Sequence, residues 1–172
     1  KDVNLSIYEI PIILSNSGID EIILERFKID KPNSSLDDWQ NLIKTIGSLD
    51  EEITIGVVGK YSELQDAYKS IDEALMHGGY ALGKKVVIEK ISAEDIENDP
   101  SVLRNVQGIL IPGGFGVRGM EGKIKAVQFS RENKIPFFGI CLGLQCAIIE
   151  FSRNVCGLNG ADSVSYTHLT LP

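Results

Sequence analysis

The sequence predicts an α/β fold, a parallel sheet flanked by helices, in the second part of the chain. From Ile53 onward, short apolar segments rich in β-branched residues alternate with longer segments of helical periodicity. Strands that alternate with helices pair in parallel and carry the helices on their faces. In such sheets the active site lies at the carboxyl ends of the strands, so functional residues are expected there.

The first part of the chain, residues 1–49, has a different pattern. The stretch "SIYEIPIIL" is a short apolar segment broken by Pro11, and "GIDEIILERFKI" has helical spacing. The turn-rich stretch "DKPNSS" follows, and Ser35 is placed to cap a helix whose apolar positions are Trp39, Leu42, Ile43 and Ile46. A boundary is expected near Asp50.

Four strands and four helices are expected after this boundary. The strands are "ITIGVV" at 53–58, "KKVVIEKIS" at 84–92, "GILIPGG" at 108–114 and "IPFFGI" at 135–140. The helices are 62–79, with Gly78 in the C′ position, then 101–106 after Pro100, 121–133, and 143–155 with Leu144, Ala147, Ile148, Phe151 and Val155 on one face.

Composition excludes several classes of function. The net charge is -7, so the chain lacks the basic surface that nucleic acid needs. No apolar stretch approaches the roughly 18 residues that span a bilayer, and the start "KDVNLSIYEI" has no signal-peptide pattern. Three cysteines without CxxC spacing indicate neither a disulfide framework nor a zinc site, and they favour a reducing cytoplasm. We expect no metal, no membrane and no nucleic acid.

A cysteine lies at the sharpest strand-to-helix turn. Gly139-Ile140-Cys141-Leu142-Gly143 is the thiol form of the G-x-S-x-G nucleophile elbow. At such a turn the thiol lies at a helix N-terminus, which favours the thiolate. The N–H of Leu142 is then free to stabilise an oxyanion, and the Gly-rich end of the preceding strand offers the N–H of Gly114 as a second donor.

The alternative is that Cys141 is a buried structural thiol and its glycines only permit packing. The Gly-rich loop at the adjacent strand end favours the catalytic interpretation. Cys146 and Cys156 are interpreted as helix-packing residues. A thiol nucleophile needs a base, and the chain has two histidines. His77 is expected at a helix end and His168 in the last residues, and no acid follows His168 to orient it, so neither is a credible base.

These motifs resemble one family closely. The stretch from Pro112 to Ser163, "PGGFGVRGMEGKIKAVQFSRENKIPFFGICLGLQCAIIEFSRNVCGLNGADS", resembles the class I glutamine amidotransferase domain of CTP synthases. "VGKYSELQDAYKSIDEALMHGG" is similar to the opening strand and helix of that domain, which has a flavodoxin-like fold, and "SIYEIPIIL" to the end of the family's amidoligase domain. The resemblance implies an amidoligase end and linker at 1–49 and the N-terminal part of the amidotransferase domain at 50–163.

The resemblance also implies a reaction. CTP synthases use ATP to phosphorylate UTP, and ammonia from glutamine displaces the phosphate to give CTP. By matching motifs, Cys141 would be the nucleophile that forms a cysteinyl thioester, and Gly114 and Leu142 the oxyanion donors. Gln145 and Gly114 would contact glutamine, and Phe115 and Arg118 the guanine of the activator GTP. ATP, UTP and Mg²⁺ would bind the amidoligase domain, outside this chain, and the complete enzyme would be a cytoplasmic homotetramer.

The resemblance stops abruptly near the end of the sequence. After Ser163 the family continues with a Glu that binds the glutamine amino group, whereas "VSYTHLTLP" at 164–172 matches nothing in the family and is expected to be foreign. The catalytic His and Glu of the family would lie further on, so the chain is expected to be a fragment that is inactive alone. Two alternatives are a non-catalytic binding or assembly module on the same scaffold and a small hydrolase that pairs Cys141 with His168.

Overall fold

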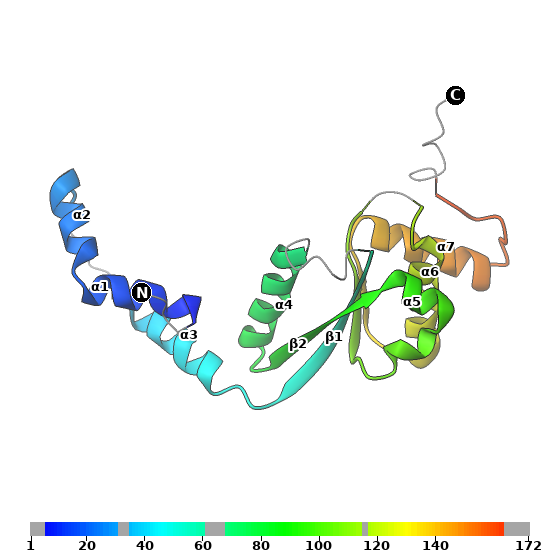
Figure 1. The fold of residues 1–172 in the computed structure, drawn as a ribbon, viewed down its shortest axis with the longest axis horizontal. Helices are drawn as coiled ribbons and strands as arrows, with labels where there is room; N and C mark the ends of the chain where they lie inside the picture. Colours follow the sequence, from blue (N-terminus) through cyan, green and yellow to red (C-terminus); the bar gives the residue numbers. More distant parts are fainter. Residues whose placement is uncertain (1–5, 31–34, 61–67, 115–116, 164–172) are drawn as a thin grey trace, which may run out of the picture. The chain divides into compact units, whose positions relative to one another are not determined.

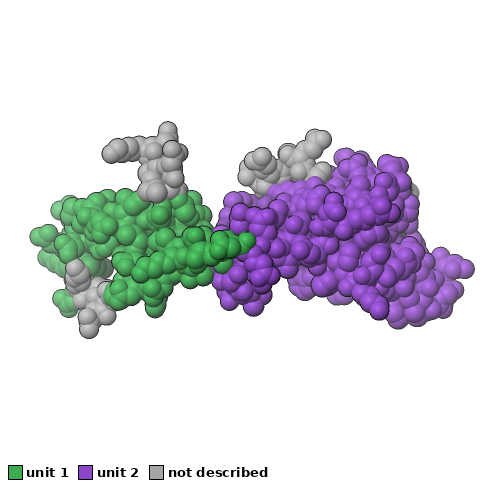
Figure 2. All heavy atoms as spheres, turned by 90° about the horizontal axis from the view of Figure 1, so that it is seen from below, with its two compact units in different colours: residues 1–50 green, residues 51–172 purple. Residues whose placement is uncertain are grey.

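The computed structural model describes residues 6–30, 35–60, 68–114 and 117–163. The chain forms two compact units, residues 1–50 and residues 51–172, which Figure 2 shows in green and purple. Within the described residues, no helix has both the length and the apolar character needed to cross a membrane.

The first unit is made of short helices. A 3₁₀ turn, η1 (Ile7–Glu9), leads into α1 (Ile10–Asn16), which is followed by α2 (Ile19–Phe27) and α3 (Asp37–Gly47). The interpretation of Pro11 as a break was wrong, because Pro11 lies in the first turn of α1, where its missing N–H costs nothing. The helix predicted after Ser35 is confirmed, but its N-cap residue is Leu36, one position later than expected.

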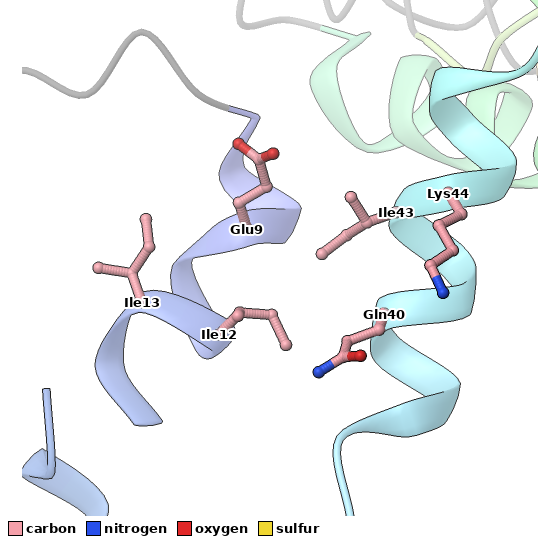
Figure 3. Close-up of a pocket in the computed structure, with 6 residues that line it drawn as sticks. All are labelled: Glu9, Ile12, Ile13, Gln40, Ile43 and Lys44. Atoms are coloured by element: carbon pink, nitrogen blue, oxygen red, sulfur yellow. The ribbon is translucent and has the colours of Figure 1, made fainter. Parts of the chain in front are cut away.

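The helices of the first unit enclose little of their apolar surface. None of α1, α2 and α3 contains a fully buried residue. The indole Nε1 of Trp39 donates a hydrogen bond to the carbonyl of Tyr8 and thereby ties α3 to η1. Ile12 of α1 and Ile43 of α3 line a cavity of about 330 Å³ between these two helices (Figure 3). The cavity is mainly apolar and offers none of the residues predicted to be functional.

The second unit contains the predicted parallel sheet. Its strands are β1 (Glu52–Gly59), β2 (Lys85–Ser92), β3 (Gly108–Ile111) and β4 (Phe137–Gly139). They pair in parallel in the order β2-β1-β3-β4. The chain therefore adds β2 on one side of β1 and then β3 and β4 on the other. The prediction of a four-stranded parallel sheet is confirmed.

Helices cover both faces of the sheet (Figure 1). One face carries α4 (Lys69–Ala81), which packs on a cluster formed by Val57, Tyr68 and Leu110 with Ile55, Ile71, Leu75, Ile88 and Ile140. The other face carries α5 (Ala93–Asn98), η3 (Pro100–Leu103), α6 (Met120–Asn133) and α7 (Leu142–Asn154). The larger core lies there, and its strand residues are Val58, Ile91, Ile109 and Ile111. The side chains of alternate strand residues thus pack against the helices on opposite faces of the sheet.

Two helix predictions need correction. The helix α4 continues past Gly78 to Ala81, and the left-handed glycine after it is Gly83, with a φ of 66°. Residues 61–67, which include the expected helix positions Leu64 and Ala67, lie outside the described residues. The helix expected at 101–106 is only the 3₁₀ turn η3, and α5 before it was missed.

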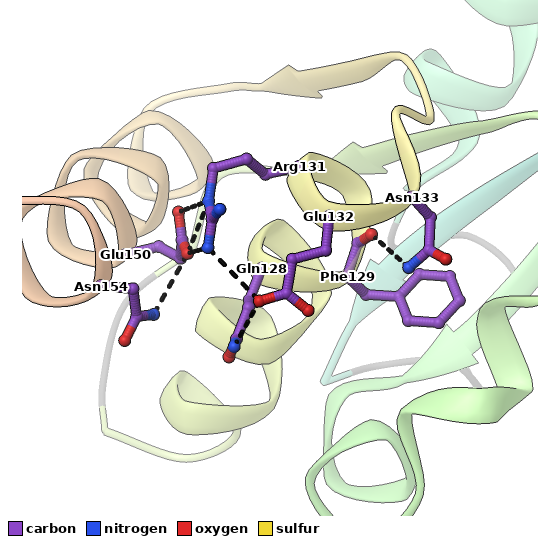
Figure 4. Close-up of polar contacts among 7 residues, drawn as sticks. All are labelled: Gln128, Phe129, Arg131, Glu132, Asn133, Glu150 and Asn154. Atoms are coloured by element: carbon purple, nitrogen blue, oxygen red, sulfur yellow. Dashed lines mark hydrogen bonds and ion pairs between the residues drawn. The ribbon is translucent and has the colours of Figure 1, made fainter.

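A buried ion pair fastens α7 to α6. The carboxylate of Glu150, which is 1% exposed, accepts hydrogen bonds from Arg131 at 2.8 and 3.0 Å and from Asn154 at 3.1 Å (Figure 4). The hydrogen bonds that Arg131 donates to this carboxylate raise the pKa of its guanidinium above the usual value. The two helices are therefore held together by charge as well as by apolar contact.

The apolar residues of α7 lie on two sides of the helix, only one of which packs on the core. Leu142, Cys146 and Ile149 are buried. Four members of the predicted apolar face, Leu144, Ile148, Phe151 and Val155, are 48–58% exposed, and the fifth, Ala147, is partly buried against the core. The position of the first turn decides this, because the close approach of Gly143 to β3 orients the helix. The interpretation of Cys146 as a packing residue is confirmed; that of Cys156 was wrong, because it follows the end of α7 and is exposed.

Candidate active site

The backbone at Cys141 is strained. Cys141 is the N-cap residue of α7, with φ 52° and ψ -103°, and it is exposed to solvent. Positive φ at a residue with a side chain is uncommon, and this ψ lies well away from the left-handed helical well. Strain of this kind persists where the surrounding structure fixes the backbone, and it clusters at functional sites.

The two glycines of the motif make this turn possible. A Cβ added to Gly143 would lie 2.2 Å from the carbonyl oxygen of Ile111, and one added to Gly139 would lie 2.4 Å from the carbonyl carbon of Gly143. The N–H of Ile140 donates to the same Ile111 carbonyl at 2.9 Å. The first turn of α7 therefore rests directly on the ends of β3 and β4, and no larger side chain fits between them.

The Gly-rich segment after β3 lies beside the cysteine. A Cβ added to Gly113 would be 3.5 Å from the Cβ of Cys141, and one added to Gly114 would be 4.0 Å from the Cδ2 of Leu142. The structure thus brings together Gly114, Cys141 and Leu142, the three residues predicted to form the nucleophile and oxyanion site. Their arrangement at the carboxyl ends of neighbouring parallel strands follows from the order of the sheet.

Gln145 lies one helical turn after Cys141. Its N–H donates to the carbonyl of Cys141 at 3.2 Å and so closes the first turn of α7. Its side-chain Oε1 accepts a hydrogen bond of 2.7 Å from the hydroxyl of Ser163. The predicted glutamine contact therefore lies one helical turn from Cys141, and its side-chain amide is held by a residue that the sequence alone did not single out.

Arg118 is in an ion pair. Its guanidinium donates to the carboxylate of Glu94, in the first turn of α5, and these hydrogen bonds lower the pKa of Glu94. Phe115, the other residue predicted to contact GTP, lies outside the described residues. The helix α5 was missed, although Ser92 with Asp95 three residues later is a capping signal, and Ser92 does accept the N–H of Glu94 at 3.2 Å.

Neither histidine is placed as a base for Cys141 by the described structure. His77 lies within α4 rather than at its end, 4.0 Å from Glu73 and against the ring of Tyr80. His168 lies outside the described residues. In the part of the chain that the structure describes, no three His, Cys, Asp or Glu side chains gather where they could hold a metal ion.

The chain is similar to known proteins along most of its length. A family model described as "Glutamine amidotransferase class-I" matches residues 63–169. CTP synthase of Clostridium acetobutylicum is 50% identical over 160 residues, and CTP synthase of Staphylococcus haemolyticus is 53% identical over 162 residues. Each match covers 92% of this chain and 30% of the relative, so the chain spans about a third of the length of these curated relatives.

A solved structure shows the same fold. The Trypanosoma brucei CTPS glutaminase domain with bound acivicin superposes with a TM-score of 0.61 at 40% sequence identity, over 67% of this chain and 46% of that chain. The family model covers more than half of the sequence and includes the strained turn at Cys141. The chain therefore belongs to the class-I glutamine amidotransferase family, in the form of this domain that CTP synthases carry.

Proposed function

We propose that this chain is the part of a CTP synthase that begins glutamine hydrolysis, with Cys141 as the nucleophile. The observation that carries the proposal is the strained backbone of Cys141, held at the strand-to-helix turn by two tightly packed glycines. A structural thiol needs no strain and no exposure, whereas a nucleophile must point out of the sheet toward a substrate. The strand order, shared with flavodoxin-like sheets, supports the site at this edge.

The chemistry follows from the groups around the turn. The sulfur of Cys141 attacks the side-chain carbonyl carbon of glutamine, and the carbonyl oxygen takes the negative charge. Backbone N–H groups of Leu142 and Gly114 stabilise that oxyanion. The carbon–nitrogen bond then breaks, ammonia leaves with a proton from a general acid, and a thioester remains. Water hydrolyses the thioester to glutamate and restores the thiol.

Substrate and activator contacts are proposed around the same edge. Gln145 and Gly114 would contact glutamine, and Phe115 and Arg118 the guanine of GTP. Because Glu94 already holds the guanidinium of Arg118, GTP would have to share or displace that ion pair. The acid–base group for Cys141 is proposed to come from residues beyond those described here, and the 172-residue chain alone is expected to hydrolyse glutamine poorly.

The wider reaction is proposed from the relatives. Ammonia released at Cys141 would aminate UTP, activated by ATP with Mg²⁺, at an amidoligase domain whose C-terminal end and linker would be residues 1–49 of this chain. No residue of this chain is assigned to ATP, UTP or Mg²⁺. A cytoplasmic homotetramer is the proposed form of the complete enzyme.

Covalent labelling tests the proposal directly. A glutamine-analogue electrophile such as acivicin should modify Cys141 in preference to the two other cysteines, and peptide mapping by mass spectrometry identifies the adduct. Iodoacetamide serves as the control, because it should modify both exposed thiols, Cys141 and Cys156, without any preference for a glutamine site. Equal labelling of Cys141 and Cys156 by the glutamine analogue would refute the proposal.

A further inference from the structure

The segment after α7 folds back toward the cysteine. This return segment, residues 157–163, begins at Gly157, whose φ of 72° turns the chain. The N–H of Leu158 donates to the carbonyl of Ser152 at 2.9 Å, and the N–H of Ala161 to the carbonyl of Leu158 at 2.9 Å. These bonds set the direction of the segment but do not attach its far end to the helix.

Arg153 makes that attachment. Its Nε donates to the carbonyl of Ala161 at 2.7 Å, and its Nη2 lies 3.7 Å from the carboxylate of Asp162. The Nη1 of the same guanidinium donates to Glu121, in the first turn of α6, at 3.0 Å. The side chain is 23% exposed, so it is largely shielded from water that would weaken these contacts. The planar guanidinium of Arg153 therefore joins α7, α6 and the return segment.

The held segment ends on Gln145. The Ser163 hydroxyl donates to Gln145 Oε1 at 2.7 Å, a short and direct hydrogen bond. Because the oxygen end of the amide accepts this bond, the Nε2 end is the one left to donate elsewhere. Within the described residues, Nε2 makes no hydrogen bond, and the residue is only partly buried.

We infer that Arg153 and Ser163 are positioning residues that fix the amide orientation of Gln145, so that its Nε2 presents a donor beside Cys141. A ligand group bound there must then be a hydrogen-bond acceptor, such as a carbonyl or carboxylate oxygen. With the proposed function, on which this identification rests, that group is an oxygen of glutamine. Arg153 acts through the return segment and touches no substrate itself.

The orientation of the Gln145 amide can be measured without any substrate. In the ¹⁵N-labelled 172-residue chain, Ser163→Ala should shift the side-chain amide signals of Gln145. Arg153→Lys keeps the charge opposite Glu121 but loses the planar guanidinium that bonds Ala161 and Glu121 at the same time. It should therefore shift the same signals in the same direction. Ser152→Ala is the matched control, because the Ser152 hydroxyl makes no hydrogen bond to any residue that the structure describes, and it should leave Gln145 unchanged.

The labelling rate of Cys141 tests the consequence. Ser163→Ala should lower the second-order rate constant for a glutamine analogue about five- to tenfold, the effect of one lost neutral hydrogen bond, and leave the iodoacetamide rate unchanged. Gln145→Glu keeps an acceptor for Ser163 but removes the donor, so it should lower the glutamine-analogue rate by at least as much.

The NMR measurement and the labelling measurement distinguish failure of the positioning inference from failure of the proposed function. Unchanged Gln145 signals in Ser163→Ala, or a shift in Ser163→Ala that Arg153→Lys does not reproduce, would overturn the positioning role. Normal glutamine-analogue labelling in Gln145→Glu would overturn the donor role. Absence of selective labelling in the unaltered chain, with the expected amide shifts present, would instead overturn the proposed function and leave the positioning inference standing.

Discussion

Replacing Cys141 by glycine should stabilise the second unit, although replacing it by alanine should not. Both substitutions remove the thiol, so they differ only in how the new residue tolerates the backbone at that position. With φ 52° and ψ -103°, any residue with a Cβ is strained, and such strain costs about 1–3 kcal/mol. Glycine has no Cβ and escapes this cost.

The expected difference follows from two opposing contributions. Glycine is more flexible in the unfolded chain, which lowers stability by about 0.5–1 kcal/mol relative to alanine. Relief of the strain outweighs this, so Cys141→Gly should be more stable than Cys141→Ala by about 1 kcal/mol. A control is Lys134, the C-cap residue of α6, with φ 57° and ψ 35°. These angles lie in the ordinary left-handed well. The difference in stability between Lys134→Gly and Lys134→Ala should therefore be smaller than that between the two Cys141 variants.

Urea unfolding followed by circular dichroism measures these free energies by linear extrapolation. Fluorescence is unsuitable because the single tryptophan, Trp39, belongs to the first unit. Equal stability of Cys141→Gly and Cys141→Ala would refute the reasoning, since the backbone would then be relaxed in the folded protein. It would also remove the main support for the cysteine as a nucleophile.

Three further outcomes follow from the same part of the fold. Gly143→Ala places a Cβ 2.2 Å from a carbonyl of β3 and should cost about 1–3 kcal/mol or more, whereas Gly160→Ala, with nothing within 4 Å, should be neutral in the same urea titration. Burial raises the pKa of the Cys146 thiol to about 11 from 9.0. The folded state therefore keeps this proton longer, so stability should fall as pH rises from about 9 to about 11 and should fall less in Cys146→Ala. Arg131→Gln should destabilise more than Glu150→Gln in thermal unfolding, because it leaves a carboxylate that is 1% exposed without its charge partner; the reverse order would contradict this account.

The sheet was predictable because its signal is local and repeated. Each strand is a short β-branched run, and alternation with helices implies parallel pairing, as observed. The turn at Cys141 was predictable for a related reason, since a glycine two residues to either side permits a close approach that only a tight turn requires. The juxtaposition of Gly114 and Leu142 depends on the pairing of β3 with β4, the strands that precede these two residues.

Other features depend on contacts between distant residues. The apolar residues of α7 occupy two sides, and the sequence pattern does not say that Leu142 and Cys146 rather than Leu144 and Ile148 face the core. That choice is made by the contact of Gly143 with β3. The role of Arg153 was equally hidden, because it joins three segments through hydrogen bonds that no periodicity records.

The strained turn is attached to the least secured strand of the sheet. β4 has three residues, and in the described sheet it pairs only with β3. Opening β4 would break few hydrogen bonds and would release the strain at Cys141, so the free energy of this local opening should lie well below that of global unfolding. Native-state hydrogen exchange should therefore find amides near Ile140 exchanging sooner than those of β1. The backbone strain at Cys141 thus favours local opening of β4, the strand that leads into the strained turn.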